Sequence, residues 1–176
     1  MLKRLPAKQD IAPVFAVIVS IIYGWSIAAF LRKIPSWILF LQVDEIIIVL
    51  VYVLTVTFLG SILFMIFLLF FCILLPVQYF KNYFAAQGAL ASLSLIGSVA
   101  IYINRYSEYG AGFLKYGPIW LGVTIMIAVF LSYLAIRVRF LRRAILWVAD
   151  RLIIFLYVFV PLSVISLSMV ILRNIF

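Results

Sequence analysis

The chain has 176 residues, of which 69% are hydrophobic and only 11% are charged, and its formal net charge is +9. A soluble domain is about half apolar and about a quarter charged, so this composition excludes an ordinary soluble fold. The positive charge does not indicate nucleic-acid binding, because the lysines and arginines flank apolar runs, as they do in membrane proteins that face anionic phospholipid.

The residues that most often carry chemistry are scarce in this sequence. It contains no histidine and a single cysteine, Cys72. Histidine is the usual axial haem ligand, the commonest metal ligand and the usual general base. The sequence also lacks a phosphate loop, a paired-cysteine motif and a zinc-protease motif. We therefore expect no cofactor, no metal site and no catalytic residues.

The first predicted span is 11–31, which lies between a basic N-terminal segment and the pair Arg32 and Lys33. A basic start before an apolar run is also typical of a cleaved signal peptide, and Ser26-Ile27-Ala28 resembles a cleavage site. The run exceeds the roughly 7–15 residues usual in such peptides, so we expect a retained span, with four spans as the alternative.

Residues 34–43 are too few to cross a bilayer, and Pro35 is expected to break the helix there. Trp37 and Phe40 suit the headgroup boundary, so the stretch predicts a short interfacial segment. A re-entrant loop that lines a site is the functional alternative.

The second predicted span is 46–75, thirty positions without one charge. A helix of that length rises about 45 Å, whereas the hydrocarbon core of a bilayer is about 30 Å thick. Asp44 and Glu45 precede it and are expected to cap the free amide groups of the helix N-terminus. A paired-carboxylate site is less favoured, because adjacent residues on a helix do not face each other.

The third predicted span, 84–103, is crowded with small residues, which let helix backbones approach closely in lipid. It also holds the only amide within a span, Gln87, which needs a partner in hydrocarbon and should therefore face protein. We expect this helix to lie centrally in the bundle. Its candidate residues for helix packing, or alternatively for a substrate path, are Gln87, Gly88, Ala91, Ser94, Gly97 and Ser98.

The fourth predicted span, 118–136, opens at Pro118 and is followed by a basic stretch. Apolar residues recur there every three or four positions with most arginines off that stripe, which predicts a short amphipathic helix at the membrane surface. The residues expected to contact anionic lipid headgroups or an acidic partner are Arg137, Arg139, Arg142, Arg143 and Arg151.

The fifth predicted span is 152–172, and Pro161 lies near its middle. Proline removes one backbone hydrogen bond, so a kink is expected near Tyr157. Nearby hydroxyls can satisfy freed carbonyls or bond to neighbouring helices. The residues expected to do so are Ser163, Ser166 and Ser168.

Five spans place the two termini on opposite faces of the membrane. The N-terminal face then carries nine of the fourteen lysines and arginines and the other face carries five. The positive-inside rule therefore predicts a multi-pass protein of the inner membrane with a cytoplasmic N-terminus and an external C-terminus. Arg32 and Lys33 run against this bias.

The stretch 5–105 contains LPAKQD, PSWILFLQVDEIIIVL and LLPVQYFKNYFAAQG. In hydropathy and spacing it resembles a group of bacterial polytopic integral membrane proteins of uncharacterised function. The five-span count is also similar to the membrane anchor of lipoteichoic-acid-synthase-like and sulfatase-like enzymes. Those enzymes carry a large extracellular catalytic domain that these 176 residues do not include. The resemblance implies an anchor or partner role and transfers no functional residue.

Taken together, residues 1–176 predict a single transmembrane domain, an all-α bundle of five membrane-spanning helices. We expect a structural or accessory protein, not an enzyme, that assembles with itself or with a second membrane protein. A small transporter or flippase for an apolar or lipid-like substrate is the alternative. A lipid-modifying enzyme is the third possibility, and its available acids are Asp44, Glu45, Glu108 and Asp150.

Overall fold

The computed structural model describes residues 6–74, 83–106 and 111–175, without the side chains of residues 8 and 111–115. Within these ranges the chain is helical and contains no strand. The all-α class is therefore confirmed. The described residues form five helices, and each is long and apolar enough to cross a membrane. They are α1 (Lys8–Trp37), α2 (Val43–Leu74), α4 (Phe84–Tyr106), α5 (Ala111–Arg137) and α6 (Arg139–Ile175).

The first helix is longer than the predicted span, and the prediction that Pro35 breaks the helix is wrong. α1 continues through Pro35 to Trp37, and only a short turn separates it from α2. A proline so close to the end of a helix costs little, because few backbone hydrogen bonds follow it. The turn is closed by the Ile38 and Leu41 amides, which donate to the carbonyls of Ile34 and Trp37 at 3.0 and 2.7 Å. Residues 34–43 thus form the end of α1, the connecting turn and the first residue of α2, and their position at a membrane interface stays a prediction.

The second helix begins with a cap that was expected from its acidic start. The Gln42 backbone N–H donates to Glu45 Oε2 at 2.9 Å, so the Glu45 side chain reaches back to the residue before the helix. This confirms the capping role of Glu45, whereas Asp44 lies exposed in the same first turn. The predicted end of this span at residue 75 lies outside the described residues.

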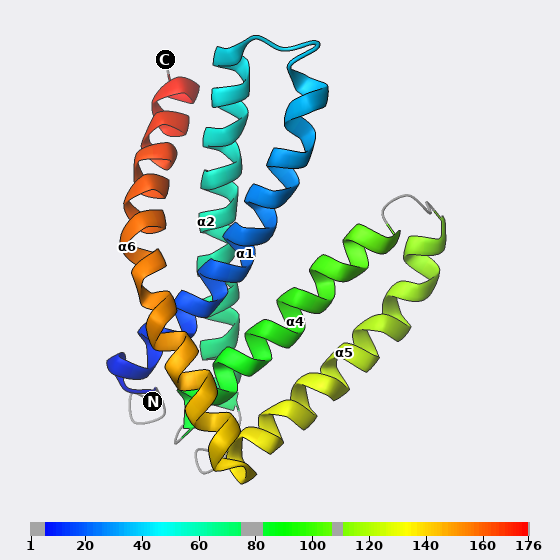
Figure 1. The fold of residues 1–176 in the computed structure, drawn as a ribbon, viewed down its shortest axis with the longest axis vertical. Helices are drawn as coiled ribbons and strands as arrows, with labels where there is room; N and C mark the ends of the chain where they lie inside the picture. The colour runs from blue at the N-terminus through cyan, green and yellow to red at the C-terminus, as the bar shows by residue number, and fades with distance from the viewer. Residues whose placement is uncertain (1–5, 75–82, 107–110, 176) are drawn as a thin grey trace.

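The basic stretch does not form a separate surface helix, and that prediction is also wrong. α6 runs without interruption from Arg139 to Ile175, and only Val138 separates it from α5. The stretch is rich in good helix formers such as Arg, Leu and Ala and contains no glycine or proline before Pro161, so nothing ends the helix. α6 stays helical through Pro161 and bends along its length (Figure 1). The assignment of that bend to Pro161 stays a prediction.

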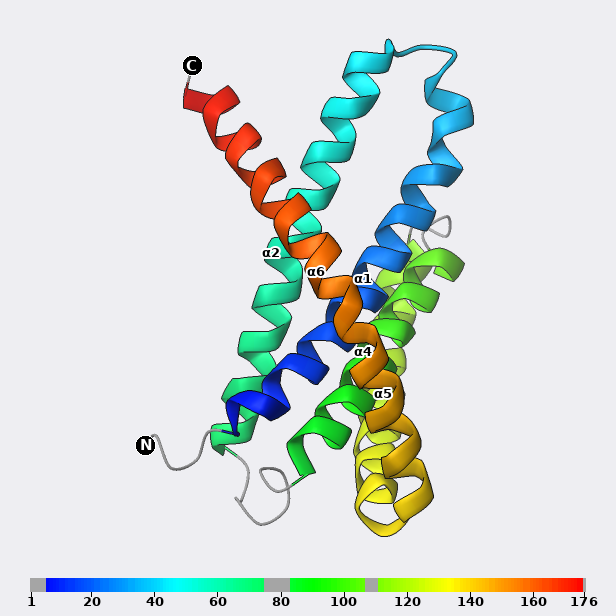
Figure 2. The ribbon, with the colours of Figure 1, turned by 60° about the vertical axis from the view of Figure 1, so that its left-hand side comes forward.

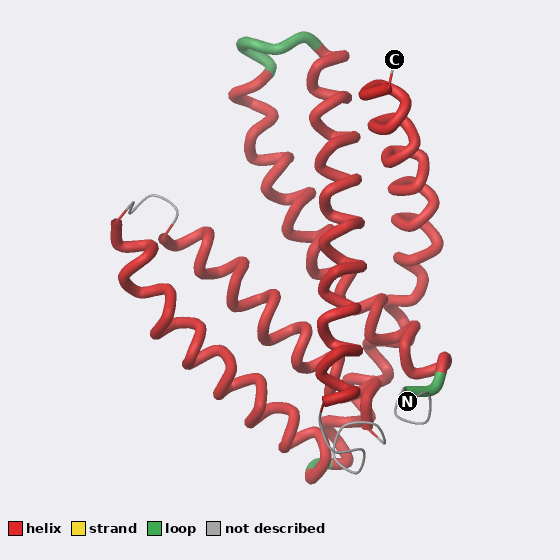
Figure 3. The backbone as a smooth tube through the Cα atoms, turned by 180° about the vertical axis from the view of Figure 1, so that it is seen from behind, coloured by secondary structure: helices red, strands yellow, loops and turns green. Residues whose placement is uncertain are grey.

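The five helices do not form a closed bundle. α1 crosses the middle of the molecule and contacts α2, α4 and α6, while α5 packs mainly on α4. The α4–α5 pair diverges from the other three helices (Figures 1 and 3). The N- and C-termini lie toward opposite ends of the molecule (Figure 2). The N-terminal part of α4 is therefore central, as predicted, whereas its C-terminal part leaves the core, and α1 shares the central position.

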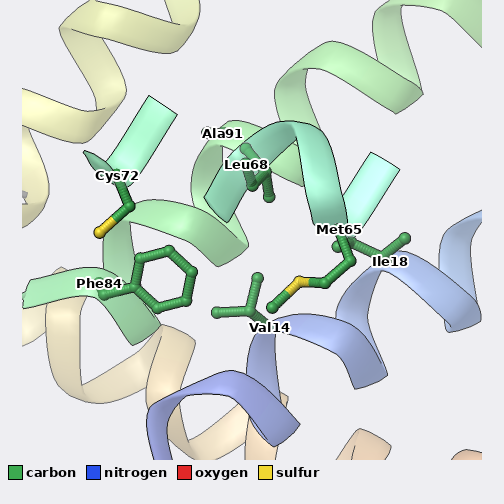
Figure 4. Close-up of a cluster of buried hydrophobic side chains, with 7 residues drawn as sticks. All are labelled: Val14, Ile18, Met65, Leu68, Cys72, Phe84 and Ala91. Atoms are coloured by element: carbon green, nitrogen blue, oxygen red, sulfur yellow. The ribbon is translucent and has the colours of Figure 1, made fainter. Parts of the chain in front are cut away.

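The core lies where the other helices meet residues 14–23 of α1. In the largest cluster, Val14 and Ile18 of α1 pack with side chains of α2 and α4, which are Met65, Leu68, Cys72, Phe84 and Ala91 (Figure 4). A second cluster joins α1, α4 and α6 through Val17, Ala89 and Ala149. A third joins α1, α2 and α6 around Val19, Tyr23 and Leu54. Most other large apolar side chains of α2, α5 and α6 are exposed, which suits a surface in contact with lipid tails.

Candidate functional site

The small residues of α4 contact different helices rather than one partner. Gly88 lies against α1, since a Cβ built there would be 3.2 Å from both Val14 methyl carbons. Ala91 is buried in the largest core cluster. Ser98 instead faces α5, where its hydroxyl lies 2.6 Å from Thr124 Oγ1 and accepts a 2.8 Å hydrogen bond from Trp120 Nε1. Gly88 and Ala91 thus pack toward α1 and α2, whereas Ser98 contacts α5.

The second half of α4 has an uncovered side. Ser94 donates to the carbonyl of Leu90 in its own helix at 2.9 Å. A Cβ added at Gly97 would have no neighbouring atom within 4 Å among the described residues. Leu93 and Ile101, one turn before and one turn after it on the same helix face, are 56% and 61% exposed. Gly97, predicted as a packing residue, therefore makes no close helix contact within the described chain.

Gln87 faces protein, as the sequence predicted. Its side chain is only 3% exposed, and Nε2 donates to the Ser132 carbonyl of α5 in a long 3.4 Å hydrogen bond. Oε1 is buried without a hydrogen-bond partner in the described part of the chain. The amide lines neither of the two cavities described below, so it lies in a helix interface rather than along either of them.

The arginines of the basic stretch have different surroundings. Arg142 is half-buried, its guanidinium lies 5.2 Å from the Tyr83 ring centroid, and it lines a cavity of about 220 Å³ together with Asp10 and the start of α4. Arg137 and Arg151 lie over the rings of Tyr133 and Trp147 on their own helices. Arg139 and Arg143 are exposed. Arg142 is thus the arginine of this set that connects the basic stretch to another part of the fold.

A larger cavity lies between α1 and α2 and was not found from the sequence. It has a volume of about 620 Å³ and a predominantly apolar wall. Its α1 side is formed by Trp25, Ser26, Ala29, Phe30, Lys33 and Trp37. Its α2 side is formed by Val49, Tyr52, Val53, Val56 and Thr57. Trp25, Phe30, Lys33 and Trp37 recur every three to five positions on α1, and that spacing is a sequence signal that could have identified this face.

The acidic residues considered for catalysis lie apart. Asp44 and Glu45 are exposed at the start of α2, and Asp150 is exposed in the N-terminal part of α6, toward the other end of the molecule (Figure 1). Glu108 lies outside the described residues. Within the described ranges, no three acidic or cysteine side chains gather in a group that could hold a metal ion.

Comparison with known proteins adds no family. No protein-family model matches the chain, and no curated protein or solved structure matches it. The resemblances in hydropathy and spacing therefore stay predictions. The helices themselves define the class, which is an all-helical protein with five helices suited to crossing a membrane.

Proposed function

We propose that this chain is a multi-pass membrane protein of structural or accessory type that assembles with itself or with another membrane protein. The supporting observation is the unequal packing of α4. Gly88 is in tight contact with Val14, whereas Gly97 on the same helix has open space around it among the described residues. Small residues permit close backbone approach and drive helix association in lipid. An uncovered glycine between exposed Leu93 and Ile101 on one helix face is therefore a suitable place for a partner helix.

The basic part of α6 provides a second contact in this proposal. Arg139 and Arg143 are exposed, and cations near an anionic leaflet each gain about 1 kcal/mol. The proposed orientation puts this end of the molecule in the cytoplasm of a bacterial cell, at the inner membrane. Anionic headgroups, or the acidic surface of a partner, would then lie beside these arginines.

The test is the mass of the complex after gentle extraction in native lipid, with every co-purifying chain identified. The proposal predicts a homo-oligomer or a stoichiometric complex with a second membrane protein. A monomer that carries only lipid would contradict it.

Substitution at Gly97 tests which face associates. Gly97→Leu places a large side chain in space that the fold leaves open, so the monomer should fold while association weakens by the order of tenfold. Gly24→Leu is the matched control, because a Cβ at Gly24 on α1 also has no neighbouring atom within 4 Å in the described chain. Equal weakening by both substitutions would argue against the α4 face.

A small transporter or flippase for an apolar or lipid-like substrate is the second candidate, and the cavity between α1 and α2 favours it. Its volume of about 620 Å³ lies within the range of about 300–1,000 Å³ typical of ligand sites. A lipid-scrambling assay in vesicles tests this role. Transport that requires the cavity should be lost when Val53→Phe fills it, whereas Val123→Phe, at an exposed position on α5, should leave it unchanged.

A further inference from the structure

The cavity between α1 and α2 lies toward one end of the molecule. The two helices separate as they approach the short connection 38–42 (Figures 1 and 2). Phe30 and Trp37 stack edge to face at 5.5 Å between ring centroids and form an aromatic part of the wall. Val53 and Val56 line the α2 side. The result is an apolar cleft that reaches the end of the molecule where α6 also terminates.

The charge in this cleft is positive. Lys33 is the only charged residue in the described lining, and it is exposed. A second cation is close, because the Arg173 guanidinium of α6 lies 5.9 Å from the ring centroid of Tyr52, which is another lining residue. The nearest acid along α2 is Glu45, one turn before Val49, and its carboxylate already accepts the Gln42 N–H. The cleft therefore complements a negatively charged group.

The two basic residues that oppose the charge bias of the sequence have different situations. Arg32 donates to Asn104 Oδ1 of α4 at 3.2 Å and to the Ala28 carbonyl at 3.3 Å, so it connects helices. Lys33 has no ion pair within the described residues. Its ammonium is thus available at the end of an apolar wall. A phospholipid has the matching arrangement, because its charged headgroup lies at the end of an apolar acyl chain.

We propose that this cleft binds one anionic phospholipid. The acyl chain would lie against Trp25, Phe30 and Val53, and the phosphate would lie beside Lys33. Phospholipids surround these helices on both sides of a bilayer, and the opposite charges favour an acidic headgroup over a zwitterionic one. This binding site goes beyond the proposed function and is independent of it, because both a subunit and a carrier can hold a lipid there.

Tryptophan fluorescence tests the proposal, because Trp25 and Trp37 line the cleft. The full chain with Trp120→Phe and Trp147→Phe is reconstituted in phosphatidylcholine vesicles that contain a small fraction of brominated phosphatidylglycerol. Brominated phosphatidylcholine is the comparison. The acidic lipid should quench with an apparent affinity about fivefold higher, the factor that corresponds to roughly 1 kcal/mol per cation near an anionic charge.

Two variants separate the charge from the cavity. Lys33→Gln should remove the preference for the acidic lipid, whereas Arg105→Gln, which removes an exposed cation from the last turn of α4, should keep it. Ala29→Phe should fill the cleft and reduce quenching by both lipids. Equal quenching by both lipids in the unaltered chain would overturn the proposal, as would a preference that survives Lys33→Gln. Neither result depends on the oligomeric state.

Discussion

Gly88 and Gly97 are nine positions apart on α4 and have opposite surroundings. A methyl group at Gly88 would meet two Val14 methyl carbons at 3.2 Å, which is tighter than ordinary van der Waals contact. Valine has a stiff branched side chain, so it cannot move aside without a shift of α1 relative to α4. At Gly97 the same methyl group would meet nothing in the described chain.

Alanine substitution at the two glycines should therefore give different results. Gly88→Ala should lower the free energy of unfolding by about 1–3 kcal/mol, because it overpacks the α1–α4 contact. Gly97→Ala should leave it unchanged or raise it by up to about 1 kcal/mol, because alanine favours the helix. Unfolding in mixed detergent micelles, followed by helical circular dichroism, measures both. Equal effects would mean that the α1–α4 contact is looser than described.

At the scale of elements, α1 and α6 are joined by a buried polar contact. The Tyr23 hydroxyl of α1 and the Ser163 hydroxyl of α6 are hydrogen-bonded, and the Tyr23 ring stacks on Phe159 at 4.6 Å between centroids. Ser166, one turn further along α6, is also buried but donates to the Leu162 carbonyl of its own helix at 2.9 Å. Two neighbouring serines thus have different roles, one between helices and one within a helix.

A double-mutant cycle distinguishes these roles. Tyr23→Phe and Ser163→Ala should show a coupling free energy of about 0.5–1.7 kcal/mol, the range of hydrogen bonds between helices in membranes. Tyr23→Phe combined with Ser166→Ala should show none, because those side chains share no bond. Reversible unfolding in mixed micelles provides the four stabilities of each cycle. Coupling in the control cycle would show that the effect spreads through α6 rather than through the hydroxyl pair.

The start of α6 is held to the start of α4 by Arg142, whose guanidinium lies over Tyr83. Arg142→Ala should lower the free energy of unfolding by about 0.5–1 kcal/mol, the usual contribution of an accessible cation–π contact. The adjacent Arg143→Ala removes the same charge from an exposed position and should change stability by less than about 0.5 kcal/mol. Identical losses would assign the effect to charge instead of the ring contact.

At the scale of the whole molecule, the termini lie toward opposite ends, as an odd number of spans requires (Figures 1 and 2). We expect alkaline phosphatase to be active when it is fused after Phe176 and inactive when it is inserted at the α5–α6 junction at Val138. Green fluorescent protein at the same two positions should give the reverse pattern. Activity of the phosphatase at Val138 would contradict the predicted orientation.

Several features of this protein follow from the sequence alone. The membrane class and the five helices follow from the lengths of the uncharged runs, and the Glu45 cap follows from local spacing. Each of these features depends on interactions within one helix or between one helix and lipid. Composition and periodicity are therefore enough to predict them. The helix ends were less predictable, because Pro35 is tolerated near the end of α1 and no breaker separates the basic stretch from the rest of α6.

The tertiary structure decided which residues have partners. The sequence assigned Gly88 and Gly97 the same role, yet nine positions place them on opposite faces of the helix, and only the face of Gly88 meets another helix within the described chain. Tyr23 and Ser163 are 140 positions apart, so no local pattern connects them. The cleft beside Lys33 likewise exists only because α1 and α2 separate toward their connection. Contacts between helices depend on how all five pack together, and the hydropathy of the sequence does not predict that arrangement.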